Sequence, residues 1–166
     1  MRDAMAKPMP RPIPSPAPPD GFFAAKVDSA GRIKLPADFQ RFLASLPEKE
    51  MFATSTEDGI AKIYINGSWA RTKEKIFAAK ENQGFAMSYF RVAAKFGGNV
   101  ELDSNGRVTL PQELRRKMSW QDTPVQLLIF KELIQIYPAD TLERQVAVDQ
   151  AAVDGNRDKL EALDLL

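Results

Sequence analysis

The sequence predicts an α+β fold in which a β-α-β unit occurs twice in one chain, with a two-helix insert between the copies. The first observation is a repeated stretch, VDSAGRIKLP at 27–36, which returns as LDSNGRVTLP at 102–111. The second is that apolar and polar residues alternate after each turn, as in a half-buried strand. The third is that each copy is followed by an amphipathic segment and a hairpin, at offsets of 75 and 73 residues, which indicates an internal duplication.

The first unit is predicted to cover residues 21–66. Its strands lie in FFAAKVD and RIKLP, and a second hairpin follows in EMFATST and IAKIYI. Between the hairpins, Pro36 opens a helix at its first turn, where a missing N–H is tolerated. The apolar side chains of this helix share one face at helical spacing and are predicted to enter the core: Phe39, Phe42, Leu43 and Leu46.

The second unit, residues 97–139, repeats this order with strands in NVELD, RVTL, VQLLIF and LIQIYP and a helix opened by Pro111. The insert, residues 67–96, is predicted to form two helices broken at ENQG, the first running from Trp69 to about Lys80 with Asn66 or Ser68 as its cap. The second helix carries an apolar stripe that is predicted to pack on the β units or on a neighbouring subunit: Phe85, Tyr89, Val92, Ala93 and Phe96.

Two further segments flank the repeated units. Residues 1–20 hold seven of the twelve prolines, so an extended, disordered arm is expected there. Residues 140–166 form an acidic, helical or disordered tail of net charge −4, interrupted at Gly155 and Asn156. The insert, in contrast, carries a net charge of +4 over residues 69–96, so a total of +1 conceals basic and acidic regions.

Composition excludes several classes of function. The chain contains neither histidine nor cysteine, so Ser-His-Asp and Cys-His catalysis, thiolate zinc sites and disulfides are excluded. Carboxylate-only or Ser/Lys chemistry stays open, although no motif indicates it, and we expect no enzyme, no metal and no cofactor. No apolar run is long enough to cross a bilayer and no secretion signal is evident, so a cytoplasmic protein without membrane contact is expected.

The repeated motif concentrates polar chemistry on one face of its strand. Alternation sends Ile33 and Leu35 inward, so Arg32 and Lys34 emerge together on the outer face. In the second copy Arg107 emerges with Thr109 in the same way. Arginine can bind a phosphate or a guanine edge through two hydrogen bonds, and turn N–H groups can also meet phosphate oxygens. These residues are therefore the candidate DNA contacts: Arg32, Lys34 and Arg107.

The remaining motif residues are expected to support the turns. Gly31 and Gly106 provide a backbone conformation that other residues resist. Asp28 and Asp103 stand four residues before each arginine, where they can accept hydrogen bonds from the turn or form ion pairs with Arg32 and Arg107. A purely structural role, in which each aspartate closes its hairpin, is the competing interpretation of the motif.

DSAGRIKLP and DSNGRVTLP resemble the D-x-x-G-R-h-x-h-P pattern of the AbrB-like swapped-hairpin superfamily. Two copies around a two-helix insert are similar to the MraZ family, repressors of the bacterial division and cell-wall gene cluster. The resemblance implies swapped hairpins that interlock within one chain, a ring-like homo-oligomer, and loops presented to direct repeats in promoter DNA. It also implies that Arg32 and Arg107 are DNA contacts. Where the family usually has arginine after the aromatic residue of the first helix, this chain has Gln40.

Three functional classes stay open at this point. A sequence-specific DNA-binding regulator, cytoplasmic and associated with the nucleoid, accounts for the duplicated loop and its outward cations. An antitoxin-like DNA-binding protein would use the acidic tail to occupy a partner, although such proteins typically carry one hairpin unit per chain. An oligomeric scaffold that binds no DNA is compatible with the modest net charge.

Overall fold

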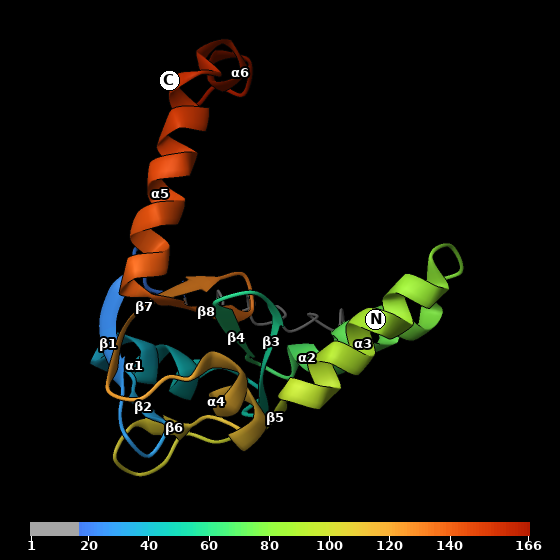
Figure 1. Cartoon of the computed structure of the whole chain (residues 1–166), viewed down its shortest axis with the longest axis vertical. Coiled ribbons are helices and arrows are strands. Elements are labelled where there is room, and N and C mark those ends of the chain that lie inside the picture. Colours follow the sequence, from blue (N-terminus) through green and yellow to red (C-terminus); the bar gives the residue numbers. More distant parts are fainter. Residues whose placement is uncertain (1–16) are drawn as a thin grey trace, which may run out of the picture.

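The computed structural model describes residues 17–166, and most of the predicted proline-rich arm, residues 1–16, lies outside this range. The described chain is a mixed α+β fold, as predicted (Figure 1). Its strands are β1 (Phe23–Val27), β2 (Arg32–Lys34), β3 (Met51–Glu57), β4 (Ile60–Tyr64), β5 (Gly98–Val100), β6 (Arg107–Thr109), β7 (Thr123–Phe130) and β8 (Leu133–Pro138). Its helices are α1 (Ala37–Ser45), α2 (Ser68–Ala78), α3 (Gln83–Phe96), α4 (Gln112–Met118), α5 (Ala139–Asp154) and α6 (Arg157–Ala162).

All eight strands belong to one antiparallel sheet in the order β5-β3-β4-β8-β7-β1-β2-β6. A bridge between Leu102 and Val108 links the chain after β5 to β6, which brings the two ends of the sheet together. The sheet is therefore nearly closed, like a small barrel. Closure leaves few unpaired edges, which is one way in which β proteins avoid edge-to-edge association.

The sheet is built by exchange between the two halves of the sequence. β1 pairs with β7, β3 with β5, β2 with β6 and β4 with β8, so each strand has a neighbour from the other half. Equivalent pairs recur at the 75-residue offset: Val27 lies opposite Ile33, and Leu102 lies opposite Val108. Neither half could form this sheet alone, because its own hairpins would be left without half of their partners.

The core follows the predicted alternation. Ile33, Leu35, Val108 and Leu110 are all at most 1% exposed, which confirms that they face inward. The apolar face of α1 is also buried, although Leu46 is only partly covered. Each fully buried aliphatic side chain of this kind contributes about 2 kcal/mol relative to an exposed one. The inward residues of β2 and β6 thereby keep the outward residues of the same strands on the outer face.

Helix starts differ in detail from the expectation. Pro36 and Pro111 stand just before α1 and α4 as their N-cap residues, with extended backbones, rather than inside the first turn. The residue before α2 is Gly67, in the left-handed region at φ 64°, so the prediction of Asn66 or Ser68 as its cap was wrong. Gly67 forms no side-chain cap, and Asn66, also at positive φ, is used in a different contact.

The insert packs against β3 through an aromatic stack. The Trp69 ring lies parallel to the Phe52 ring at 4.4 Å between centroids, and it is also nearly parallel to the Phe90 ring of α3, at 6.4 Å. Stacked aromatic pairs add about 1 kcal/mol to the area they bury. Of the apolar stripe predicted on α3, Ala93 is fully buried, but Phe85 is 76% exposed. One end of this stripe therefore packs within the chain, and packing of the other end on a neighbouring subunit stays a prediction.

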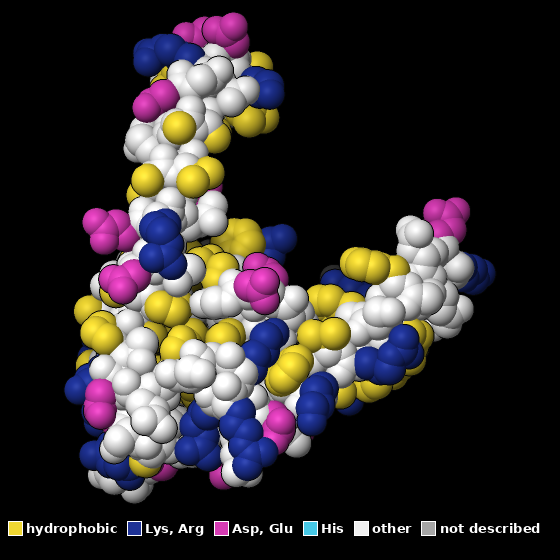
Figure 2. All heavy atoms as spheres, viewed as in Figure 1, with side chains coloured by type: hydrophobic (Ala, Val, Ile, Leu, Met, Phe, Trp, Pro, Cys, Tyr) yellow, Lys and Arg dark blue, Asp and Glu magenta, His cyan; other side chains and the backbone are white. Residues whose placement is uncertain are grey.

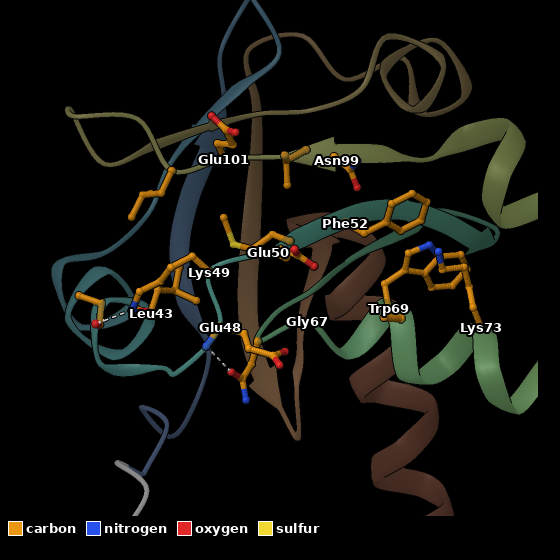
Figure 3. Close-up of a pocket in the computed structure, with 16 residues that line it drawn as sticks. Leu43, Glu48, Lys49, Glu50, Phe52, Gly67, Trp69, Lys73, Asn99 and Glu101 are labelled. Atoms are coloured by element: carbon orange, nitrogen blue, oxygen red, sulfur yellow. Dashed lines mark hydrogen bonds between the residues drawn. The ribbon is translucent and has the colours of Figure 1, made fainter.

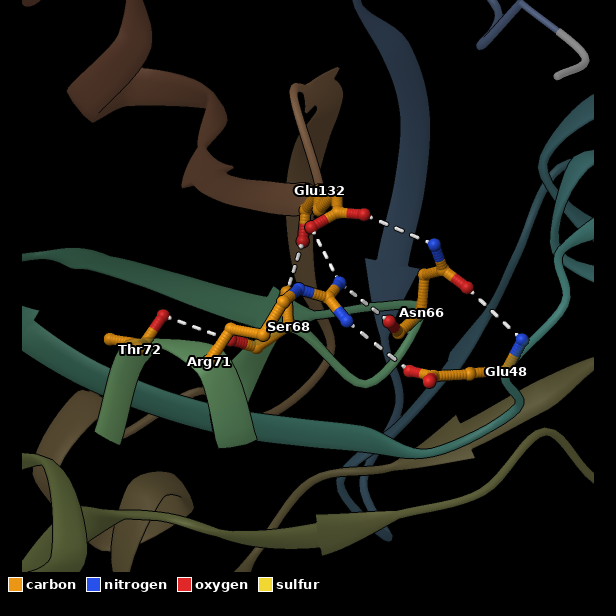
Figure 4. Close-up of polar contacts among 6 residues, drawn as sticks. All are labelled: Glu48, Asn66, Ser68, Arg71, Thr72 and Glu132. Atoms are coloured by element: carbon orange, nitrogen blue, oxygen red, sulfur yellow. Dashed lines mark hydrogen bonds and ion pairs between the residues drawn. The ribbon is translucent and has the colours of Figure 1, made fainter. Parts of the chain in front are cut away.

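A polar network at the base of α2 fixes the orientation of the insert (Figure 4). The Glu132 carboxylate, in the turn between β7 and β8, accepts from Arg71 of α2 at 2.7 Å and from Asn66 at 3.0 Å. Arg71 is the main reason that the pKa of Glu132 lies below its ordinary value. Asn66 in turn accepts from the backbone amide of Glu48 at 3.0 Å. The network thus joins three segments far apart in sequence: the chain before β3, the start of α2 and the turn between β7 and β8.

The C-terminal helices extend away from the body. α5 begins where β8 ends and projects outward, and α6 turns at its far end (Figure 1). Gly155 and Asn156 separate the two helices, at the interruption expected from the sequence. Neither helix contains a buried residue. Across residues 17–166, none of the helices combines the length and the apolar character that a membrane span requires.

Candidate nucleic-acid interface

The antiparallel pairing of β2 with β6 gathers the predicted cations on one surface. Arg32 lies opposite Thr109, and Lys34 lies opposite Arg107, while Ile33 and Val108 between them point into the core. Residues directly opposite in an antiparallel pair share a face. The three cations therefore form one cluster that faces outward. Figure 2 shows Lys and Arg side chains gathered at this end of the body, far from α5.

Loop 1, residues 28–32, is closed by its aspartate. Oδ1 of Asp28 accepts hydrogen bonds from the amides of Ala30 and Arg32, both at 2.9 Å. Oδ2 accepts from Nε of Arg32 at 2.9 Å, which makes an ion pair between half-exposed side chains. The Gly31 amide donates to the Asp28 carbonyl at 3.0 Å. The predicted salt bridge is present in this loop.

Loop 2, residues 103–107, has the same backbone pattern but different side-chain contacts. Oδ1 of Asp103 accepts from the amides of Asn105 at 2.8 Å and Arg107 at 2.9 Å, and the Gly106 amide donates to the Asp103 carbonyl at 3.0 Å. Within residues 17–166, the guanidinium of Arg107 has no ion-pair partner. The salt bridge considered for this copy is therefore absent, and Arg107 is the less restrained of the two arginines.

These contacts change one expectation about phosphate binding. The amides at the third, fourth and fifth positions of each loop donate inward, to the aspartate side chain or its carbonyl. The sequence had suggested that these amides could bind phosphate oxygens, but their hydrogen bonds within the turn make them unavailable. Any anion contact at the loops would therefore depend mainly on the outward cations.

Each loop is also held by a cation from the other half of the chain. The Ala30 carbonyl accepts from Arg115 of α4 at 3.0 Å. The equivalent carbonyl in loop 2 belongs to Asn105 and accepts from the ammonium of Lys34 on β2. Lys34 thus bridges the two halves while its side chain stays on the outer face. The cluster is a joint product of both halves, not two independent loops.

The loop glycines are required by backbone conformation, and a Cβ at either position would also displace a neighbouring side chain. Gly31 has φ +75°, and a Cβ built there would lie 1.9 Å from Cδ of Arg115. Gly106 has φ +72°, and a Cβ there would lie 2.3 Å from the side-chain amide of Gln40. Gln40 and Arg115 stand 75 residues apart, so they occupy equivalent places in the two units. Each helix therefore seats one side chain against the turn of the opposite unit.

The two aspartates are held as carboxylates. The hydrogen bond from the Arg32 amide is the main cause that lowers the pKa of Asp28, and the Arg32 side chain and the Ala30 amide add to it. The Arg107 amide lowers the pKa of Asp103 in the same way, assisted by the Asn105 amide. Hydrogen bonds to the charged form are the usual origin of such shifts. Both loops therefore keep their shape at neutral pH.

Sequence reasoning missed the supporting role of Arg115 and Gln40. Neither belongs to the repeated ten-residue stretch, and only the 75-residue offset marks them as equivalent. That offset could have identified Gln40 and Arg115 as equivalent residues. It could not show that each contacts the loop of the other half, because that contact arises from the exchange of strands. The Nε atom of Arg115 is buried without a hydrogen-bond partner, so the packing of this side chain carries a cost.

A cavity of about 720 Å³ opens between the end of α1, β3, the start of α2 and the chain after β5 (Figure 3). Its walls include Met51, Phe52 and Trp69, with Glu48 and Lys49 at the rim. The Lys49 ammonium is already used, because it donates to carbonyls at the end of α1. No group of acidic side chains that could hold a metal ion occurs within residues 17–166. The cavity therefore shows less organised chemistry than the cation cluster.

Comparison with known proteins gives a consistent family. A family model described as "MraZ protein, putative antitoxin-like" matches residues 97–162. The transcriptional regulator MraZ of Acidobacterium capsulatum is 34% identical over 57% of this chain and 65% of its own length, slightly under two thirds. The protein of the same name from Koribacter versatilis is 27% identical over 76% of this chain and 86% of its own. That from Caldicellulosiruptor saccharolyticus is 26% identical over 87% and 98%.

Among solved structures, the solution structure of PHS018 from Pyrococcus horikoshii overlays with a TM-score of 0.31 at 15% identity, covering 69% of this chain and 84% of that one. So low a score does not define a shared fold. The sequence relatives are more informative, since the family match includes loop 2, the helix that supports loop 1, and the second hairpin. The chain is similar to transcriptional regulators named MraZ, over most of its length in two of these relatives.

Proposed function

We propose that this protein is a DNA-binding transcriptional regulator whose recognition surface is the cluster of Arg32, Lys34 and Arg107. The observation that carries the proposal is the β2–β6 pairing, which sets the three cations side by side on an outward face. Cations that neutralise phosphates supply most of the affinity of such proteins for DNA, and arginine can also read a guanine edge. The names of the relatives, transcriptional regulators, support this assignment.

The fold that we propose is a pair of AbrB-like swapped-hairpin units within one chain. The exchange of strands between the halves supports it, because the first hairpin of each unit pairs with the second hairpin of the other. In this arrangement the two Asp-x-x-Gly-Arg loops lie close together, because the strands that follow them, β2 and β6, pair with each other. The proposed unit boundaries are 21–66 and 97–139, with the insert at 67–96 between them.

The cluster holds three cations within the part of one chain that the structure describes, which is few for specific binding. We therefore propose that several chains assemble into a ring-like oligomer that presents repeated copies of the cluster to direct repeats in promoter DNA. Linked weak sites gain affinity through a high effective concentration. As in the family that the sequence resembles, the proposed targets are promoters of the division and cell-wall gene cluster, with repression as the effect. Such a regulator would act on the chromosome, in the cytoplasm and at the nucleoid.

The test is a fluorescence-anisotropy titration with DNA from the region upstream of the protein's own gene, at several salt concentrations. In the double variant Arg32→Ala, Arg107→Ala we expect weaker binding and a salt slope smaller by about one unit per lost phosphate contact. The matched control is Arg144→Ala, which removes an exposed arginine of α5 far from the cluster. Equal affinity and slope in both variants would remove the cluster from the recognition surface.

A second candidate rests on the acidic α5–α6 segment, which stands clear of the body. In an antitoxin-like protein this segment would occupy the active site of a basic partner, such as a small nuclease. Co-expression and pull-down with a neighbouring basic nuclease would support that role. Absence of DNA binding even at low salt, with an intact oligomer, would instead favour a scaffold that uses this fold without DNA.

A further inference from the structure

Two arms of opposite charge project from the body and do not meet. The insert arm, residues 68–96, comprises α2 and α3, and carries six basic and two acidic side chains. The C-terminal arm, residues 139–166, comprises α5 and α6, and carries three basic and seven acidic side chains. Figure 1 shows them leaving the body in different directions. Their net charges, +4 and −4, are equal and opposite.

The outward stripe of α3 combines apolar and basic side chains. Phe85 and Val92 are 76% and 38% exposed, and they lie seven residues apart on one face of the helix. Ser88 lies between them on this face, and Arg91 lies at its edge, about 100° around the helix from Val92; both are exposed. Arg91 has no ion-pair partner within residues 17–166. The stripe therefore offers apolar surface and an unneutralised positive charge together.

The outward stripe of α5 has the complementary composition. Val146 and Val153 are 49% and 47% exposed and are also seven residues apart. Asp149, between them, forms no ion pair within the part of the chain that the structure describes. Seven residues correspond to about 10.5 Å along a helix, so the apolar positions of the two stripes have the same spacing.

We propose that the C-terminal arm of one copy packs along the insert arm of a second copy. Within one chain the arms cannot meet, because α5 is anchored on β7 and β8, whereas α3 packs on α2, β3 and α4. Apolar contact between the two stripes supplies the affinity, and opposite charges select the pairing and its orientation. The occupant of each arm is thus a second copy of this chain.

The contact joins two different surfaces, so it is heterologous. Heterologous contacts generate rings when the rotation between subunits closes. The inference therefore deepens the proposed ring-like assembly and rests on it for its biological purpose. The cation cluster lies at the opposite end of the body from α5, so it stays exposed when the arms are paired (Figures 1 and 2).

The absence of cysteine makes a direct test possible. A full-length chain with Ser88→Cys is mixed with a differently tagged chain with Gln150→Cys, and the mixture is oxidised. Both positions are exposed and lie midway along their stripes, so either helix orientation would bring them together. The expected product is a disulfide between the two tagged chains. The control replaces Gln150→Cys by Val148→Cys, which is 66% exposed but lies on another side of α5.

A charge exchange tests the same contact without oxidation. Native mass spectrometry or light scattering measures the assembly of full-length chains carrying Arg91→Asp, Asp149→Arg, or both substitutions. Each single change should raise the concentration needed for assembly by about tenfold, which corresponds to 1.4 kcal/mol. The double variant should restore assembly, because the opposite charges are then exchanged between the arms.

The outcomes separate this inference from the proposed function. Equal crosslinking at positions 148 and 150, or unchanged assembly in both single variants, overturns the arm contact even if the parent protein binds DNA. Loss of DNA binding in Arg91→Asp with assembly intact also overturns it and assigns the insert arm to DNA. If the charge exchange restores assembly while the parent protein binds no promoter DNA, the contact stands and the proposed function fails.

Discussion

Loops 1 and 2 share one backbone and differ in how their side chains are engaged. In both, the aspartate accepts hydrogen bonds from two amides of its own turn. In loop 1 the arginine is paired with its aspartate, and Arg115 supports the turn from α4. In loop 2 the arginine is unpaired within residues 17–166, and Lys34 supports the turn from β2. The two loops thus share one backbone hydrogen-bond pattern but differ in the partners of their side chains.

If the cluster binds DNA as proposed, this difference predicts different contacts for the two arginines. Arg32 is held in one position by Asp28, which suits a contact of fixed geometry, such as a base edge. Arg107, which has no ion-pair partner within residues 17–166, can adjust its position, which suits a phosphate. Lys34 has two roles, because its charge belongs to the outer face while its ammonium holds the Asn105 carbonyl. These differences should be measurable in the stability of the variants and in their affinity for DNA.

The largest expected effect concerns loop shape. Gly31→Ala should lower the free energy of unfolding by about 3 kcal/mol, since it adds backbone strain at positive φ and displaces Arg115. The matched control is Gly59→Ala, at φ +72°, where a Cβ would meet only Thr141 at 3.7 Å, and about 1 kcal/mol is expected. Urea unfolding measures both. In an Arg115→Ala background the cost of Gly31→Ala should fall toward that of the control, and equal costs throughout would contradict the packing argument.

Alanine substitution of the two arginines should affect DNA affinity and thermal stability to different extents. Arg107→Ala should weaken DNA binding by about tenfold at moderate salt and leave thermal stability unchanged, because its guanidinium has no ion-pair partner within residues 17–166. Arg32→Ala should weaken binding to a similar degree and also lower stability slightly, since it removes the contact with Asp28. Anisotropy and thermal unfolding on the same samples report the two quantities. A stability loss confined to Arg107→Ala would reverse the comparison.

A smaller effect is expected when the outward strand residues are exchanged. Lys34→Thr makes the first copy resemble the second, and Thr109→Lys does the reverse. Lys34→Thr should lower the salt slope of DNA binding by about one unit, and Thr109→Lys should raise it by a similar amount. The added lysine would lie directly opposite Arg32, so a slight loss of stability should accompany it. Slopes equal to that of the parent in both variants would show that cations at these two positions make no phosphate contact.

The smallest expected difference is the pH dependence of the two aspartates. Both have pKa values lowered below 3.8 in the folded protein, so their contribution to stability is present above about pH 3.8 and is lost as the pH falls further. Asp28→Asn and Asp103→Asn should therefore destabilise the protein at pH 7, and the difference from the parent should narrow below pH 4. The narrowing should be larger for Asp28, which also binds the Arg32 side chain. Urea unfolding across pH 2–7 measures it.

The sequence was most informative where local periodicity decides structure. Alternation in RIKLP and RVTLP identified which side chains are buried, and the 75-residue offset identified equivalent hairpins. It was less informative at helix ends, where Gly67 rather than Asn66 precedes α2, because Asn66 is engaged by Glu48 and Glu132 across the fold. It also left the partner of Phe85 open, because an apolar stripe does not reveal whether each of its residues packs within the chain or on another subunit.

By itself, then, the sequence determined the composition of the two loops, the direction of Arg32, Lys34 and Arg107, and the opposite charges of the two arms. These properties depend on residue type and on the period of a strand or helix. Only the tertiary structure decided that, among residues 17–166, Arg32 has an ion-pair partner while Arg107 has none, and that Arg115 and Gln40 support the opposite loop. Such contacts arise from strand exchange between halves, which brings together residues about 75 positions apart, and no local pattern encodes that exchange.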